Sequence, residues 1–293
     1  MSILVNKNSR VLCQGITGTQ ATFHIRRSLD YGTNVVAGVT PGKGGNTHLD
    51  LPVFNTVKEA LKETQANCSV MYVPARFVKD AVKEAAEAEL DLVVTIADGV
   101  PVHDMIEIKN ILRGSKTKLI GPNTPGIITP GEARLGIFPE NIHNPGRIGV
   151  VSRSSTLTYE AVIETKRAGM GQSTVIGLGD DMIFGIDFVD VLKEFMKDDG
   201  TDAIIMIGHL GGTFEEEAAA YYKTLKNPKP IISLVVGNAI PFGHKMGYAG
   251  DIITKGKITV QDKKDIMASA GMTVVDTIAQ IHEKLLELFP KAA

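Results

Sequence analysis

The sequence predicts an α/β fold of two domains, each built on a parallel, doubly wound sheet. Three observations predict it: short runs rich in β-branched residues alternate with amphipathic stretches, one segment rich in Pro and Gly interrupts the alternation, and the alternation then resumes. Strand–helix alternation is typical of parallel sheets with helices on both faces. A chain of 293 residues is long enough to bury two separate cores.

The first half of the chain contains five apolar runs with the length of buried strands. Helical patterns separate them, and the clearest is Ala75–Leu90, where apolar residues recur at intervals of three and four. The predicted strands of this half are Arg10–Cys13, Asn34–Val39, Ser69–Val73, Leu92–Ile96 and Lys118–Ile120.

The segment between the two halves cannot continue either pattern, because Pro and Gly recur throughout it. We therefore predict a first domain over residues 1–125, a linker over residues 126–146 and a second domain over residues 147–293. Five more apolar runs predict the second sheet. Its predicted strands are Arg147–Val151, Ser173–Leu178, Ala203–Ile207, Ile231–Val236 and Met272–Val275.

The composition argues against several classes of protein. A net charge of −2 gives no basic excess for nucleic acid or an anionic membrane. No apolar run reaches the roughly 18 residues of a spanning helix, and no targeting signal is recognisable. Cys13 and Cys68 are too few for a disulfide framework, and no histidine lies at metal-ligand spacing, so we expect no metal site. We expect a cytoplasmic protein, with the mitochondrial matrix or a related organelle left open.

The first candidate site is Gln14–Gln20 (QGITGTQ), which follows the first predicted strand and opens the first helix. Glycines let the backbone turn tightly there, and the free N–H groups at a helix start attract phosphate. The spacing is G-x-x-G and not the full dinucleotide fingerprint. On its own, this motif is compatible both with a phosphate site and with a tight turn that binds nothing.

A lysine follows the second strand, in the loop Thr40–Gly45 (TPGKGG). An NAD site usually has an acidic residue about 20 positions beyond the glycine turn, to bind the ribose 2′-hydroxyl. Lys43 suits a ribose phosphate instead, and coenzyme A carries one on its 3′-oxygen. NADP, which also has a ribose phosphate, and a solvated loop lysine stay as alternatives.

Four further segments complete the pattern: Leu51–Thr56 (LPVFNT), Gly121–Gly131 (GPNTPGIITPG), Arg147–Ala161 (RIGVVSRSSTLTYEA) and Glu215–Tyr221 (EEEAAAY). Together the six segments resemble the α subunit of succinyl-CoA synthetase-type (succinate–CoA ligase) enzymes, in the same order and at similar spacing. The resemblance covers essentially the whole chain. It implies an N-terminal Rossmann-like CoA-binding domain followed by a flavodoxin-like, doubly wound ligase domain.

By position, the resemblance implies that CoA is bound by the glycine turn, by the lysine and by the loop after the fourth strand. The family has Thr-Glu where this chain has Ala97-Asp98. The implied CoA-binding residues are Thr17, Gly18, Thr19, Gln20, Lys43, Ile96, Ala97 and Asp98.

A second candidate anion site is Ser152–Thr156 (SRSST), where hydroxyls and free N–H groups meet at a helix start. A plain serine cap is the alternative. The resemblance implies a phosphoryl site at Ser154, Ser155 and Thr156, and a contact between Tyr159 and the carboxylate substrate. The family has glycine where Ser155 stands, and the added side chain obstructs close backbone approach.

The family's reaction is a phosphate relay, in which the nucleotide phosphorylates a histidine, the phosphate passes to the acid, and CoA attacks the acyl phosphate. That histidine lies in a Gly-His-Ala-Gly motif, whereas this chain has Tyr248 at the same position. Tyr248 is a poor substitute, because a phenol with a reference pKa of about 10 offers little nucleophile at pH 7. His209 stands where the family has the glutamate that orients the histidine.

Three explanations of these substitutions stay open. His209 has become the phosphoryl acceptor, or His244, four residues before Tyr248, reaches the phosphate, or the chain carries no phosphate and binds only CoA or a partner. The acidic run Glu215–Glu217 opens a helix, where the dipole favours negative charge, and we expect no further role for it.

The resemblance implies that a dicarboxylate, usually succinate, is ligated to CoA. ATP or GTP and Mg²⁺ would be bound by a β subunit with an ATP-grasp site, in an αβ or α2β2 assembly, since this chain has no Walker-type loop. The alternative is a non-catalytic CoA-binding or regulatory paralogue of the α subunit. An NADP-dependent oxidoreductase is disfavoured, because the second half shows no hydride-transfer constellation.

Overall fold

The computed structural model describes residues 2–237 and 259–290 and divides into two compact units. The N-terminal unit comprises Leu4–Phe138 together with Ile183–Ile186. The C-terminal unit comprises Ser2–Ile3, Pro139–Met182 and the described residues from Asp187 onward. Ile183–Ile186 joins the N-terminal unit because the N–H groups of Gly185 and Ile186 donate to the carbonyls of Gly121 and Leu119.

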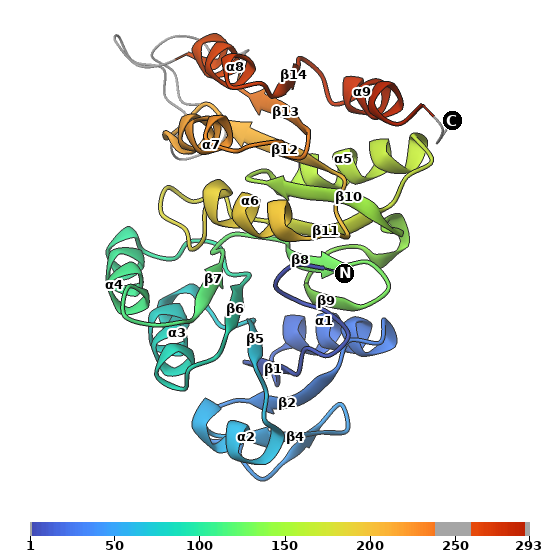
Figure 1. Cartoon of the computed structure of the whole chain (residues 1–293). Coiled ribbons are helices and arrows are strands. Elements are labelled where there is room, and N and C mark those ends of the chain that lie inside the picture. The colour runs from blue at the N-terminus through green and yellow to red at the C-terminus, as the bar shows by residue number, and fades with distance from the viewer. Residues whose placement is uncertain (1, 238–258, 291–293) are drawn as a thin grey trace. The chain divides into compact units, whose positions relative to one another are not determined.

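The N-terminal unit is built on a sheet with the strand order β3-β4-β2-β1-β5-β6-β7. Only the pairing of β3 with β4 is antiparallel. The other six strands, from β4 to β7 in the sheet, pair in parallel and have the Rossmann order. In Figure 1, α1 lies on one side of this sheet and α3 and α4 on the other. The elements are β1 (Val11–Gln14), α1 (Thr19–Asp30), β2 (Val35–Val39), β3 (Thr47–His48), β4 (Leu51–Phe54), α2 (Val57–Thr64), β5 (Cys68–Met71), η1 (Ala75–Phe77), α3 (Val78–Glu87), β6 (Leu92–Thr95), α4 (Val102–Leu112), β7 (Lys118–Ile120), β8 (Gly126–Thr129) and β9 (Ala133–Gly136).

Five strands of the C-terminal unit pair in parallel in the order β14-β13-β12-β10-β11, which is the flavodoxin-like arrangement. In Figure 1, α5 and α9 lie on one side of these strands and α6, α7 and α8 on the other. The elements are η2 (Glu140–Ile142), β10 (Pro145–Ser152), α5 (Ser155–Arg167), β11 (Gln172–Gly177), α6 (Phe188–Lys197), β12 (Ala203–His209), α7 (Phe214–Lys223), β13 (Ile231–Val236), α8 (Val260–Ser269), β14 (Thr273–Val275) and α9 (Gln280–Leu288).

The predicted fold class is therefore confirmed, and every predicted strand overlaps an observed one. One difference bears on function. The predicted strand Ser69–Val73 ends at Met71, which leaves Tyr72 and Val73 in the loop that follows. The predicted helix Ala75–Leu90 begins with a single 3-10 turn, and the α-helix starts only at Val78.

An antiparallel hairpin, β8 and β9, was not predicted and lies within the segment predicted to be a linker. Gly126 and Gly136 face each other across the hairpin, and a Cβ atom at Gly126 would lie 2.0 Å from the carbonyl oxygen of Leu135. The two glycines thus permit a close backbone approach. In the sequence the same glycines, together with Pro130, indicate a break in regular structure.

The glycine turn after β1 is packed directly against β2. Ile16 is fully buried, and a Cβ atom at Gly38 of β2 would lie 2.1 Å from Cγ2 of Ile16. Only glycine at position 38 leaves room for this contact. The isoleucine therefore anchors the turn, and with it the start of α1, to the sheet.

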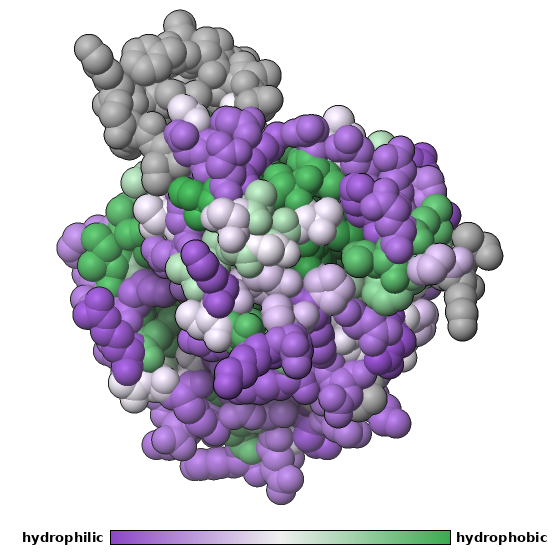
Figure 2. All heavy atoms as spheres, turned by 45° about the horizontal axis from the view of Figure 1, so that its top comes forward, coloured by the Kyte–Doolittle hydropathy of each residue, from purple (hydrophilic) through white to green (hydrophobic). Residues whose placement is uncertain are grey.

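The part of the chain that the structure describes contains no helix long and apolar enough to cross a membrane. On the face drawn in Figure 2, hydrophobic residues are interspersed with hydrophilic ones. Most of the large apolar side chains of the strands lie in the two cores instead. Leu12, Val93 and Leu119 are examples from the N-terminal core, and Ile205 and Ile232 from the C-terminal one.

Candidate functional site

The strand order of the N-terminal unit reverses direction at β1, which lies between β2 and β5. In parallel α/β sheets ligands bind at this point, outside the carboxyl ends of the strands. The turn after β1 contains Gly15, which has a φ of +83°. A Cβ atom there would lie 3.0 Å from the carbonyl oxygen of Tyr72, so glycine allows the loops after β1 and β5 to meet.

The predicted phosphate residues lie at the start of α1. Gly18 is the N-cap and offers no side chain to the first turn, while Thr19 and Gln20 are exposed on that turn. The first N–H groups of an α-helix have no acceptor within the helix, so they are available to an anion. The hydroxyl of Thr17 lies 3.4 Å from that of Thr40, which ties this turn to the loop after β2.

The loop that carries Lys43 is organised by one side chain from outside it. Oδ1 of Asn55 accepts the N–H groups of Gly42 at 2.9 Å and of Gly44 at 3.0 Å. Lys43 itself is exposed, its N–H donates to the carbonyl of Thr40 and its carbonyl accepts from Nδ2 of Asn46. The lysine side chain is therefore presented to solvent on a loop of defined shape.

A cavity of about 790 Å³ opens between these loops. It is walled by the ends of β1 and β2, by the loop after β5 and by η1 and α3. Of the predicted CoA residues, Gly18 lines it, whereas Lys43 does not. Its lining residues are Gln14, Gly15, Gly18, Val39, Thr40, Pro41, Gly42, Asn55, Thr56, Tyr72, Val73, Pro74, Phe77, Asp80, Ala81 and Glu84.

A second cavity of about 450 Å³ shares Tyr72, Val73 and Pro74 with the first. Four predicted residues line it, namely Gln20 and the loop Ile96–Asp98. His24 also lines it, with its ring stacked on Tyr72 at a centroid distance of 5.7 Å. The structure thus brings predicted residues from α1 and from the loop after β6 to one cavity.

Tyr72 was missed by the sequence analysis because it was assigned to a strand. Its hydroxyl donates to the carbonyl of Gly136 at 2.9 Å, which holds the ring between the two cavities. The alternation of apolar and polar residues gave no sign of this role. The only available signal was the Val73-Pro74 pair, since the residue before a proline is disfavoured in helix and often ends an element.

In the C-terminal unit, the predicted phosphoryl site lies where β10 leads into α5. Ser154 is the N-cap of α5, and its Oγ accepts the N–H of Leu157 at 3.3 Å. Oγ of Ser152 accepts the N–H of Ser154 and donates to its carbonyl, both at 2.9 Å. Thr156 is exposed and Ser155 partly exposed on the first turn, and the partly exposed Tyr159 follows one turn later.

His209 is the last residue of β12, and its side chain is 0% exposed. Nδ1 lies 3.4 Å from Oδ1 of Asp180, and the backbone N–H donates to Oε1 of Glu215 at 2.9 Å. Burial, reinforced by the positive charges of Arg153 and Lys263, lowers the pKa of His209 to about 3. The imidazole is therefore neutral at pH 7.

Glu215, which accepts the N–H of His209, also takes part in a buried ion pair that was not predicted from the sequence. Nζ of Lys263 in α8 contacts Oε2 of Glu215 at 2.7 Å and Oε2 of Glu216 at 2.8 Å. It also donates to the carbonyl of Gly212 at 2.8 Å. The expectation that the acidic run serves only the helix dipole is wrong for Glu215 and Glu216. Both open α7, but their carboxylates bind a lysine 47 or 48 positions away.

Two family models match the chain, a CoA-binding domain over residues 6–99 and a CoA-ligase over residues 151–275. The α subunit of the ADP-forming succinate–CoA ligase of Staphylococcus epidermidis (strain ATCC 12228) is 50% identical over 292 residues, which cover 100% of this chain and 96% of that protein. This chain belongs to the succinate–CoA ligase α-subunit family. The family resemblance expected from the motifs is thereby confirmed. The corresponding subunit of Staphylococcus aureus (strain N315) is 49% identical with the same coverage.

The chain also resembles solved structures of larger proteins. ATP citrate lyase from Methanothrix soehngenii, in complex with citrate and coenzyme A, has a TM-score of 0.86 at 25% identity. The likeness covers 98% of this chain and 51% of that one, so the chain spans about half its length. A dinucleotide-forming acetyl-coenzyme A synthetase of Ca. Korarchaeum cryptofilum has a TM-score of 0.72 at 17% identity, covers 94% of this chain and 60% of that one, and shows the fold alone.

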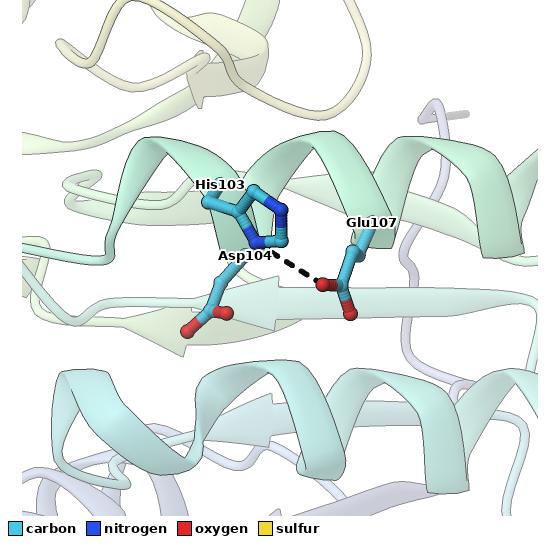
Figure 3. Close-up of side chains that lie close together, drawn as sticks. All are labelled: His103, Asp104 and Glu107. Carbon is cyan, nitrogen blue, oxygen red and sulfur yellow. Dashed lines mark ion pairs between the residues drawn. The ribbon is translucent and has the colours of Figure 1, made fainter.

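Within the described residues, one group has the composition of a metal site, His103, Asp104 and Glu107 on α4 (Figure 3). His103 is 81% exposed and its Nδ1 lies 3.1 Å from Oε1 of Glu107. Nζ of Lys79 lies 2.9 Å from Asp104 and 3.1 Å from Glu107. A lysine ammonium therefore supplies the cation between the two carboxylates, and the group is a surface ion-pair network.

Two residues of the predicted relay, Tyr248 and His244, lie outside the described residues. The structure therefore places only one of the two substituted relay positions, His209.

Proposed function

We propose that this chain is the α subunit of a nucleotide-dependent succinate–CoA ligase with an impaired phosphate relay. The complete reaction joins a carboxylic acid to CoA at the expense of ATP or GTP and releases acyl-CoA, a nucleoside diphosphate and phosphate. One observation carries the proposal: half of all residues are identical, over the full length, to α subunits with this name. The acid is a dicarboxylate, for which succinate is the compound that the relatives' names give.

The N-terminal unit binds CoA in this proposal. The diphosphate lies at the start of α1, near Thr17, Gly18 and Thr19, where free N–H groups favour an anion. Lys43 contacts the 3′-phosphate, and Gln20 with Ile96–Asp98 contacts the pantetheine arm. The two neighbouring cavities support this arrangement, because together they run from the loop after β2 to the loop after β6.

The C-terminal unit supplies the phosphoryl and carboxylate sites. Ser154, Ser155 and Thr156 occupy the N-terminus of α5, where the helix dipole favours a phosphoryl group. Tyr159, one turn later, contacts the carboxylate of the acid. Ser155 stands where the family has glycine. Its side chain leaves less room for a phosphoryl group to approach the backbone at the start of α5.

A β subunit completes the enzyme. The relatives are named as α subunits of an ADP-forming ligase, which supports a two-subunit assembly. We assign the nucleotide and Mg²⁺ to an ATP-grasp site of that partner, because the sequence of this chain has no Walker-type loop. The assembly is αβ or α2β2 and functions in the cytoplasm.

The relay is impaired because Tyr248 replaces the nucleophilic histidine. His209 is neutral, which suits a nucleophile, but its side chain is buried and lies against Asp180. This burial supports a positioning role for His209 over that of phosphoryl acceptor. A second candidate function follows from the same observation, a non-catalytic CoA-binding or regulatory paralogue of the α subunit.

The test is an assay of the full chain reconstituted with its cognate β subunit, succinate, CoA and ATP or GTP. We expect slow acyl-CoA formation and no acid-labile phosphate on the chain by mass spectrometry. Restoring Tyr248→His together with His209→Glu should recover more activity than the two single changes combined, because the positions act as a unit.

Three outcomes separate the alternatives. A normal turnover rate that survives His209→Ala contradicts the impaired relay. Loss of both turnover and acid-labile phosphate in His209→Ala makes His209 the acceptor. A doubly restored chain that binds CoA and the β subunit but forms no acyl-CoA supports the non-catalytic paralogue.

A further inference from the structure

The larger cavity of the N-terminal unit has a polar wall where β1, α2 and α3 meet. Gln14 ends β1, Thr56 caps α2, and Glu84 lies on α3 one turn after Ala81. All four line the cavity. The lining also includes the apolar residues Val39, Val73, Pro74 and Phe77.

Hydrogen bonds hold two side chains of this wall, the amide of Gln14 and the carboxylate of Glu84, in defined orientations. Oε1 of Gln14 accepts from the hydroxyl of Ser69 at 2.8 Å, and Nε2 donates to the carbonyl of Ala81 at 3.0 Å. Oε1 of Glu84 accepts the N–H of Val57, the first residue of α2, at 2.8 Å. Glu84 is thereby tied to the start of α2.

This arrangement leaves acceptor capacity on Glu84. An ionised carboxylate has two oxygens with about four lone-pair sites and no donor. The N–H of Val57 occupies part of that capacity, and Glu84 is only half-buried and borders the cavity. A donor bound in the cavity therefore finds an oriented, negatively charged acceptor. A ligand carbonyl in the same place meets repulsion.

The cavity suits the base of CoA. Adenine is the one aromatic ring of CoA, and apolar walls that include Phe77 favour a flat ring. The exocyclic amino group of adenine is a hydrogen-bond donor, whereas hypoxanthine has a carbonyl oxygen at the same position. A fixed carboxylate distinguishes the two by charge and by hydrogen bonding, because its oxygen accepts from the amine of adenine and repels the carbonyl oxygen of hypoxanthine.

We infer that Glu84 determines base specificity in this cavity by accepting a hydrogen bond from the exocyclic amine of a 6-aminopurine. The inference rests on the proposed function, since CoA is the ligand that brings the purine. Val57 is the positioning group in this scheme, because its N–H acts through the Glu84 carboxylate.

Isothermal titration of the full-length chain with CoA and with its deaminated analogue, in which hypoxanthine replaces adenine, tests the inference. We expect CoA to bind at least roughly tenfold more tightly than the analogue, as for a hydrogen bond to a charged group. Glu84→Gln keeps an oxygen for the Val57 N–H and adds an N–H₂ donor that suits the hypoxanthine carbonyl. The preference for CoA should therefore fall by about tenfold or reverse.

Two variants control the experiment. Glu87→Gln makes the same change of charge on the same helix, but Glu87 is exposed and pairs with Lys83, so the ratio of the two affinities should stay unchanged. Lys43→Ala should weaken both ligands equally, because it acts on a phosphate that both carry. Thermal unfolding of each variant shows that the fold is retained.

The outcomes distinguish this inference from the proposed function. If CoA binds but Glu84→Gln leaves the affinity ratio unchanged, Glu84 does not select the base and the CoA-binding proposal stands. If Glu84→Gln weakens both ligands equally, Glu84 is structural and the inference is wrong. If neither ligand binds the wild-type chain, the CoA proposal and the inference both fail.

Discussion

Nδ1 of His209 lies 3.4 Å from Oδ1 of Asp180, so the buried imidazole of β12 contacts the carboxylate of the loop after β11. The two residues come from strands on either side of β10. Because the pKa of His209 is lowered to about 3, the contact at pH 7 joins a neutral imidazole to a carboxylate.

We predict that this histidine makes the protein less stable in acid. The unfolded state takes up the proton below about pH 6.5, whereas the folded state resists it until about pH 3. Between these values the unfolded state binds more protons, so the free energy of unfolding falls as the pH falls. His209→Gln removes the titrating group. Between pH 6.5 and pH 4.5 the free energy of unfolding of the wild type should therefore fall by about 2–3 kcal/mol more than that of His209→Gln.

Urea denaturation of both proteins at pH 6.5 and 4.5 measures this difference. His282→Gln on α9 provides the control, since it removes a partly exposed histidine of the same unit. A gap between wild type and His209→Gln that is equal at the two pH values would contradict the prediction. Arg153, Lys263 and Asp180 stay in place in the variant, so the difference reports on the histidine alone.

We predict that Lys263→Met is strongly destabilising, by about 3–5 kcal/mol. The side chains of Lys263 and Glu215 are both 0% exposed, so loss of the lysine leaves a carboxylate buried without its counter-charge. Chemical denaturation measures the loss. Adding Glu215→Gln to Lys263→Met should recover part of it, because the uncompensated charge is removed.

The adjacent residue of α8 is a matched control for that experiment. Lys264 pairs with Asp276, whose side chain is 77% exposed. The Lys264 side chain is only 8% exposed, but Asp276 stays in contact with water when its partner is lost, so Lys264→Met should cost less than Lys263→Met. If Lys263→Met and Lys264→Met lower the free energy of unfolding equally, the buried pair between Lys263 and Glu215 contributes no more to stability than the pair between Lys264 and Asp276.

We predict that Asn55→Ala weakens CoA binding by roughly tenfold, about the effect of one or two lost hydrogen bonds. The N–H groups of Gly42 and Gly44 lose their shared acceptor, and the loop around Lys43 must then be ordered on binding. Gly44→Ala should act in the same direction, since its Cβ atom would lie 2.4 Å from Nδ2 of Asn55. Calorimetric titration with CoA measures both.

Asn67→Ala is the control for the Asn55 variant. Oδ1 of Asn67 accepts the N–H of Arg10 at the opposite end of β1, so this change removes the same kind of bond far along the strand from the cavity. CoA affinity should be unaffected. A similar loss of affinity in Asn55→Ala and Asn67→Ala would indicate a general loss of stability instead of a disordered loop.

We predict that Lys43→Ala weakens CoA by about 1.5–3 kcal/mol, as for a hydrogen bond between charged groups. Dephospho-CoA, which lacks the 3′-phosphate, should bind the wild type and Lys43→Ala with equal affinity. The comparison of the two ligands identifies the phosphate that the lysine contacts. Binding of NADPH without binding of CoA would refute the assignment of this site.

Much of the fold and several site positions could be predicted because their signals are local. The strand Lys118–Ile120 and the helix that begins at Ser155 follow from apolar runs and a serine cap within a few residues of each element. The glycine turn before α1 could be recognised because phosphate sites require free N–H groups at a helix start. The family followed from motifs in their order along the chain, which needs no knowledge of the fold.

The fold class, the family and the segments that carry the candidate site could thus be predicted from the order of residues alone. Which side chains meet there depends on tertiary packing. Glu84 contacts the N–H of Val57, 27 positions away, and Glu215 contacts Lys263, 48 positions away. The physical reason is that helix and strand periodicities describe the exposure of a face, whereas such pairings depend on how α2 packs near α3, and α7 against α8.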